Sequence, residues 1–150
     1  MAVFETTNFG TISFGPESAI EFPAGLPAFE DCRRFAAVRL ENSDPLLFLQ
    51  SLERPDLCFV TVPVFVIDPH YRLDVKEEDL ELVSFPAGRR PRIGEDIACL
   101  AVLSFRDTGA TANLLAPLLV NLRNLKAVQA VTAAGYSHQH PLPVKAPNAT

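Results

Sequence analysis

Cysteine is scarce in this 150-residue chain, and the pattern of the three that occur excludes a disulfide framework or a zinc-binding CxxC pair. Cys32, Cys58 and Cys99 lie far apart in the sequence. Cys58 and Cys99 fall within apolar runs, where a thiol packs as a small hydrophobic side chain. Unpaired cysteines of this kind are typical of a reducing compartment.

Long hydrophobic runs are also missing. No run approaches the roughly 18–20 apolar residues that a membrane-spanning helix needs. The first residues, MAVFE, lack the basic and apolar regions of a signal peptide. We therefore expect a soluble, cytoplasmic protein.

Glycine is rare, with seven residues against thirteen prolines, which favours short elements and rigid turns over a helical bundle. The hydrophobic fraction of 48% and the eleven phenylalanines suffice for a sizeable core, and the length fits one domain. Composition thus favours an all-β or α+β domain. The end of the chain is rich in proline, so we expect a domain over 1–142 and a flexible tail over 143–150.

Acidic side chains are absent after Asp107, and charge is divided unevenly along the chain. Residues 1–75 carry 11 acidic and 5 basic side chains, a net of −6; residues 76–150 carry 7 and 8, a net of +1, and the total is −5. Such a charge repels nucleic acid and can attract a basic partner, although acidity also serves solubility alone. Direct RNA binding is disfavoured further because basic and aromatic residues are not interleaved.

The common catalytic motifs are absent as well: the chain has no GxSxG, no HExxH and no GxxxxGK[ST]. The acids at 77–81 could be drawn as paired carboxylates, but this spacing is typical of the solvated face of a helix. His138 and His140 could approach a metal from one side of a strand, but no third ligand lies nearby. We therefore expect no enzyme activity, no metal and no cofactor, and a function in binding.

Alternating apolar residues and β-branched side chains predict a series of short strands. Pro63 cannot donate to a ladder, so we expect a bend or bulge there. A short helix is predicted over 74–83, with Asp74 as its N-cap and acids in its first turn. The strands are expected at 3–7, 11–14, 19–22, 34–40, 46–52, 57–67 and 97–105.

The stretch 111–121, TANLLAPLLVN, is the one around which we expect the chain to be organised. Its leucines recur at helical spacing and favour a helix. Pro117 would cost about 3 kcal/mol in a helix interior, although it is tolerated at the first position of a helix. Buried asparagine must be hydrogen-bonded, so Asn113 and Asn121 need specific partners. Periodicity leaves helix and strand open here.

The loop FPAGLPAFE at 22–30 is made rigid by two prolines and a glycine. Leu26, Pro27 and Phe29 could be anchors that meet a partner at low entropic cost. The alternative is a loop whose apolar residues only close over the core.

These two motifs, with Leu49-Gln50-Ser51, the run from Phe59 to Pro63, Tyr71 and Gln129, occur in the order found in the flagellar assembly factor FliW family, which the chain resembles over roughly residues 3–142. Ala28 stands where the family usually has a second glycine. The resemblance implies a mostly β fold: a small antiparallel β-barrel-like single domain with one or two short helices. It also implies that 114–121 forms two β segments separated by a break at Pro117.

The resemblance further implies a cytoplasmic protein that is not an enzyme and that binds two proteins, the translational regulator CsrA and flagellin. Members of the family remove CsrA from flagellin messenger RNA by an allosteric, non-competitive route, and accumulating flagellin in turn takes up the FliW protein. A basic regulator suits an acidic partner, and the amphipathic helices of flagellin suit an apolar groove. No direct nucleic acid, membrane or small-molecule substrate is expected.

We expect the partner-binding residues to come from the rigid loop, the acidic helix and the proline-marked stretch. Asn113, Asn121 and Gln129 could equally tie backbone groups that the break leaves unpaired. A small-ligand-binding β-barrel or an unrecognised enzyme is the alternative, and it predicts a deep pocket with converging polar groups. The candidates are Leu26, Pro27, Phe29, Glu77, Glu78, Glu81, Asn113, Pro117, Asn121 and Gln129.

Overall fold

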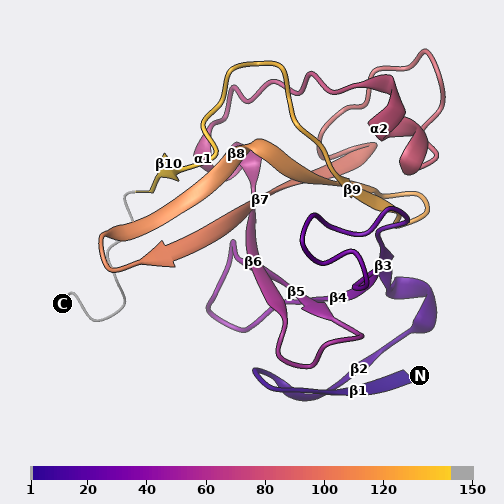
Figure 1. Ribbon diagram of the computed structural model, residues 1–150, viewed down its shortest axis with the longest axis vertical. Helices are drawn as coiled ribbons and strands as arrows, with labels where there is room; N and C mark the ends of the chain where they lie inside the picture. The colour runs from indigo at the N-terminus through magenta and orange to yellow at the C-terminus, as the bar shows by residue number, and fades with distance from the viewer. Residues whose placement is uncertain (1, 143–150) are drawn as a thin grey trace.

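The computed structural model describes residues 2–142, and over this range the chain is built mainly of antiparallel strands (Figure 1). The expected tail, 143–150, lies outside the described residues. The strands are β1 (Ala2–Thr6), β2 (Gly10–Phe14), β3 (Ile20–Glu21), β4 (Arg34–Val38), β5 (Leu47–Ser51), β6 (Cys58–Pro63), β7 (Ile97–Arg106), β8 (Gly109–Asn121), β9 (Ala127–Gln129) and β10 (His140–Pro141). The helices are α1 (Val64–Ile67), α2 (Glu77–Leu82) and a 3-10 turn at Pro16–Ser18.

The main sheet follows the order β10-β8-β7-β6-β5-β4-β3, and β9 pairs with β8. The β3 end of this path meets the segment just before β9, where Glu21 forms a parallel bridge with Lys126 and the Glu21 amide donates to the Leu125 carbonyl at 3.0 Å. The sheet is therefore a nearly closed antiparallel barrel, as expected. β1 and β2 form a separate hairpin at the lower edge of the molecule (Figure 1).

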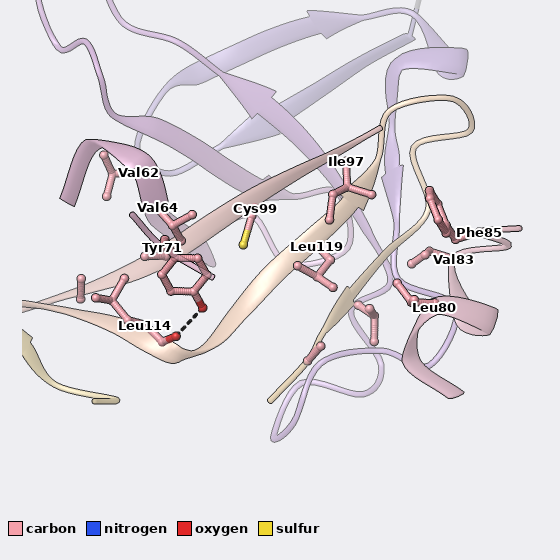
Figure 2. Close-up of a cluster of buried hydrophobic side chains, with 14 of the residues drawn as sticks. Val62, Val64, Tyr71, Leu80, Val83, Phe85, Ile97, Cys99, Leu114 and Leu119 are labelled. Atoms are coloured by element: carbon pink, nitrogen blue, oxygen red, sulfur yellow. Dashed lines mark hydrogen bonds between the residues drawn. The ribbon is translucent and has the colours of Figure 1, made fainter. Parts of the chain in front are cut away.

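Strand β7 is buried on both faces, which explains its continuous apolar sequence. Ile97, Cys99 and Ala101 pack into one core cluster, whereas Leu100, on the opposite face, packs inside the barrel with Phe22, Phe35, Leu49 and Leu118. The first cluster lies between β7, β8 and the segments that carry α1 and α2 (Figure 2). Burial raises the pKa of the Cys99 thiol to about 12, so Cys99 acts as a packing residue.

The pairing of β8 with β7 is interrupted in its middle. Asn113 lies opposite Val102 and Leu118 lies opposite Leu100, so residues 114–117 of β8 face only Ala101. The extra residues form a large bulge that contains Pro117, which has no N–H for a ladder. The break at Pro117 is therefore present, and the helical spacing of the leucines was misleading.

Two predicted elements are wrong in their bounds. The strand expected over 57–67 ends at Pro63, because the chain turns there into α1. Val64 is buried while Phe65 and Val66 are exposed, a pattern that a helical turn gives and an alternating strand does not.

The helix expected over 74–83 begins at Glu77, and Lys76 rather than Asp74 precedes it. Asp74 is held elsewhere: its amide donates to Thr132 Oγ1 at 2.9 Å, and its carbonyl accepts from the Ala133 amide at 2.8 Å. Tertiary bonds to a distant segment thus replace the predicted cap. Neither helix in the described part of the chain has the length or hydropathy to cross a bilayer.

Candidate functional site

The loop between β3 and β4 folds into two tight turns. The Gly25 amide donates to the Phe22 carbonyl at 2.9 Å, and the Phe29 amide donates to the Leu26 carbonyl at 2.8 Å. Gly25 has a φ of +71°, and a Cβ there would lie 2.7 Å from the carbonyl oxygen of Glu30, so only glycine fits. The loop is therefore fixed by local hydrogen bonds and presents Pro27 to solvent above the buried Leu26.

Ala28 also adopts a positive φ, of +70°. This value at the residue after Pro27 is the geometry of a type II turn, which favours glycine at that position. Glycine would adopt this φ without strain. The chain tolerates alanine at a cost of about 1–2 kcal/mol in backbone strain.

The bulge at 114–117 shows how the chain can break a ladder without leaving backbone groups unpaired. The amides of Leu114 and Leu115 donate to the Ser137 carbonyl at 3.0 and 3.2 Å, and the Ala116 amide donates to Asn113 Oδ1 at 2.9 Å. The carbonyls of 114, 115, 116 and 117 accept from the Tyr71 hydroxyl, the Thr132 amide, Gln129 Nε2 and the Ala130 amide respectively. Every backbone donor and acceptor of the bulge is thus satisfied within the protein.

Asn113 and Gln129 therefore supply bonds that the bulge requires. Tyr71 supplies another: its hydroxyl donates to the Leu114 carbonyl at 2.6 Å (Figure 2), and its ring stacks on Tyr136 at 4.3 Å. Burial raises the pKa of the Tyr71 hydroxyl, which keeps it protonated as a donor.

The fixed loop and the bulge line a common groove. Leu26, Pro27 and Phe29 lie along it from the loop, and Asn113 and Gln129 from the bulge side. The structure thus brings together five of the ten sequence-predicted candidates. The other lining residues are Phe59, Val102, Ser104, Leu118, His138 and Gln139.

The groove has a volume of about 240 Å³, which is below the roughly 300–1,000 Å³ of typical small-molecule sites. Its floor is aromatic and aliphatic: Phe29 packs edge-to-face on Phe59 with ring centroids 5.7 Å apart, and the guanidinium of Arg54 lies 5.6 Å from the Phe29 ring. Uncharged amide and hydroxyl groups surround this floor. The arrangement can hold an apolar side chain and hydrogen-bond its neighbouring polar groups.

Asn121 lies outside this groove, and the expectation that it ties the break is wrong. Its side chain is buried, its Nδ2 donates to the Val83 carbonyl at 2.9 Å, and its Oδ1 accepts from the Arg123 amide at 2.9 Å. Asn121 therefore joins the end of β8 to the end of α2. Pro117 is buried and does not line the groove.

The acidic candidates Glu77, Glu78 and Glu81 are also remote from the groove. All three are exposed on α2, which Figure 1 shows on the far side of the barrel from the β7–β8 hairpin tip. Glu77 borders a larger cavity of about 700 Å³ that is lined by side chains of both charges: Arg72, Arg89, Arg90 and Asp74. This end of the molecule is charged, whereas the groove is not.

The adjacent basic loop is ordered by ion pairs. Arg92 contacts Glu95 at 2.8 Å and Asp96 at 3.3 Å, and Arg89 lies 3.7 Å from Asp96. The Arg92 backbone and guanidinium donors hold the pKa of the Asp96 carboxyl below its usual value. Among residues 2–142, no three histidine, cysteine or acidic side chains are placed to hold a metal ion.

Sequence reasoning missed the contributions of Val102, Ser104 and His138 to the groove. Val102 and Ser104 lie two residues apart on one face of β7, a spacing that the strand prediction contained. His138 comes from a segment without regular structure. The bonds from the Leu114 and Leu115 amides to the neighbouring Ser137 carbonyl hold this segment beside the groove. No local pattern could have located it.

Comparison with known proteins agrees with this architecture. The family model described as FliW protein matches residues 3–142. The chain is 32% identical to the flagellar assembly factor FliW of Syntrophomonas wolfei over 138 residues, covering 91% of this chain and 86% of that protein. It is 29% identical to the FliW of Bacillus subtilis over 143 residues, covering 93% and 96%.

A crystal structure of the flagellar assembly factor FliW superposes with a TM-score of 0.81 at 26% identity, covering 93% of this chain and 96% of that one. The family model therefore spans the barrel, the fixed loop and the bulged β8. The protein belongs to the FliW family of flagellar assembly factors.

Proposed function

We propose that this flagellar assembly factor acts by binding two proteins, CsrA and flagellin, and not by catalysis. Binding to CsrA relieves its repression of flagellin messenger RNA by an allosteric, non-competitive route. Binding to flagellin makes the protein a chaperone and a sensor, because accumulated flagellin withdraws it from CsrA. The protein acts in the cytoplasm in this scheme.

The observation that carries the proposal is the convergence of Leu26, Pro27, Phe29, Asn113 and Gln129 on one groove with a rigid wall. Preformed anchors bind a partner without a large ordering cost. The groove lining contains no Asp, Glu, Lys or Arg, so it suits an apolar segment of flagellin. We assign this groove to flagellin.

The acidic helix supports a separate assignment. Glu77, Glu78 and Glu81 stand exposed on α2, and CsrA is a basic RNA-binding protein. Complementary charge speeds association, and the same acidic surface would repel RNA from the complex. We assign α2 and its surroundings to CsrA.

Isothermal titration of the purified protein with CsrA and with flagellin monomer from the same bacterium tests the proposal. Binding of both at micromolar concentration or tighter is expected. Binding of neither would overturn the proposed function and would favour a ligand-binding barrel or an enzyme.

Charge reversal tests the assignment of α2. Changing Glu77, Glu78 and Glu81 together to lysine moves the net charge from −5 to +1 (−5 plus 6) and should slow association with CsrA about tenfold at low salt. The matched control reverses Glu5, Glu17 and Glu41, which are exposed and give the same net charge. Equal slowing by both triple variants would show that only net charge matters.

A further inference from the structure

Strand β7 continues beyond the point where its pairing with β6 ends. Its pairing with β6 ends at Thr61 opposite Val102, whereas β7 continues to Arg106. The β7–β8 hairpin therefore extends as an arm away from β6 (Figure 1). Within residues 2–142, no strand pairs with the β6-facing edge of residues 104–106.

The register of the hairpin shows which backbone groups face this open edge. Opposite residues of an antiparallel pair point their N–H and C=O groups either both toward each other or both away. Phe105 lies opposite Ala110, and the Ala110 carbonyl accepts from the Leu142 amide, outside the hairpin. The backbone groups of Phe105 therefore point away from β8 into the open edge, whereas the pairing of Val102 with Thr61 engages the Leu103 amide with β6.

This edge contains no proline, lysine or bulge, which protect other sheet edges from pairing, and its one charged side chain is Arg106. The sequence from Leu103 to Arg106 is Leu-Ser-Phe-Arg, its register with β8 is regular, and the Phe105 side chain is 58% exposed. By contrast, the edge strand β10, which pairs with β8, is protected by Pro141.

The open edge also borders the groove. Val102 and Ser104 line the groove from one face of β7. A strand that paired with Phe105 would direct every second side chain over that face. The groove lining contains no Asp, Glu, Lys or Arg, so the matching segment is uncharged.

We propose that an extended, uncharged segment of flagellin adds as a strand to the β7 edge at Phe105, with alternate side chains entering the groove. This inference rests on the proposed function for the identity of the partner. It specifies strand addition, because a groove of about 240 Å³ holds one or two side chains and not the row of anchors along a helix. A second copy of this chain fits less well, because edge-to-edge pairing would set Arg106 of one copy against Val102 of the other, where no carboxylate lines the groove.

The experiment replaces Phe105 with proline. The Phe105 amide does not bond to β8, so proline removes an edge donor while the hairpin ladder stays intact. Phe105→Val is the matched control, since it removes the ring but keeps the N–H. Thermal unfolding of both variants establishes that each is folded.

We expect Phe105→Pro to weaken flagellin binding at least about tenfold, and Phe105→Val to stay within about threefold of the unchanged protein. Hydrogen exchange should show the Phe105 amide protected only in the flagellin complex. Equal affinities for the two variants, with the Phe105 amide unprotected, would overturn strand addition while leaving the proposed function in place. Absence of flagellin binding by the unchanged protein would instead overturn the proposed function, and self-association abolished by Phe105→Pro would overturn the assignment to flagellin.

Discussion

Replacing Asn121 with alanine should destabilise the protein without directly altering the groove. The side chain is 4% exposed and makes two hydrogen bonds, to the Val83 carbonyl and from the Arg123 amide, both at 2.9 Å. Each bond contributes about 0.5–1.5 kcal/mol. The Val83 carbonyl keeps a second donor, Asn124 Nδ2 at 3.1 Å, so it is not left unpaired.

We therefore expect a loss of about 2 kcal/mol in the free energy of unfolding. For a chain of this size, that corresponds to a decrease in Tm of roughly 4–8 °C. Chemical unfolding followed by circular dichroism measures the free energy, and the midpoint should fall without a change in slope.

Asn124→Ala is the matched control, because Asn124 is exposed and shares the Val83 carbonyl. Alone it should cost about 1 kcal/mol or less. The double variant should cost more than the sum of the single changes, because it leaves the fully buried Val83 residue without a side-chain donor to its carbonyl. An unchanged stability of Asn121→Ala, or strict additivity in the double variant, would refute the structural role. Lost binding at unchanged stability would make Asn121 an interface residue.

Three further changes probe the bulge and the fixed loop. Tyr71→Phe removes the donor to the Leu114 carbonyl and should lower the free energy of unfolding by about 1–2 kcal/mol, measured in urea. Gly25→Ala should destabilise by at least 2 kcal/mol and lower the yield of folded protein, because its Cβ would meet the Glu30 carbonyl; an unchanged Tm would contradict this. Ala28→Gly should leave Tm unchanged or raise it slightly, because relief of the positive φ offsets the added flexibility of the unfolded chain; a decrease of several degrees would show that the turn is not strained.

The alternating strands could be predicted from the sequence because each carries its own local pattern. Residues 34–40, 46–52 and 97–105 each form a strand close to the predicted bounds, since apolar residues on strands must meet the two cores. The loop at 22–30 was also accessible, because proline and glycine restrict the backbone wherever they occur. Local chemistry therefore located the elements that need no distant partner.

The features that the sequence predicted wrongly depend on residues far away in the chain. Asp74 has the chemistry of an N-cap, but Thr132 binds its amide and the helix begins three residues later. Leucines at 114–125 have helical spacing, but those at 114–119 lie in β8 because residues 130, 132 and 137 supply the bonds that the bulge needs, and Leu122 and Leu125 fall in the turn after the strand. Both errors arise from tertiary hydrogen bonds that override a local preference.

The bulge in β8 links the fold to the groove through the same side chains. The side-chain oxygen of Asn113 accepts a hydrogen bond from the Ala116 amide, and the side-chain amide of Gln129 donates one to the Ala116 carbonyl. Both residues also line the groove. A partner that contacts their amides would compete with bonds that close the bulge, so affinity and stability at these two positions cannot be varied independently. The residues at which binding can be altered without loosening the barrel are exposed groove residues that make no bond to the bulge, such as Pro27 in the loop and Ser104 on β7.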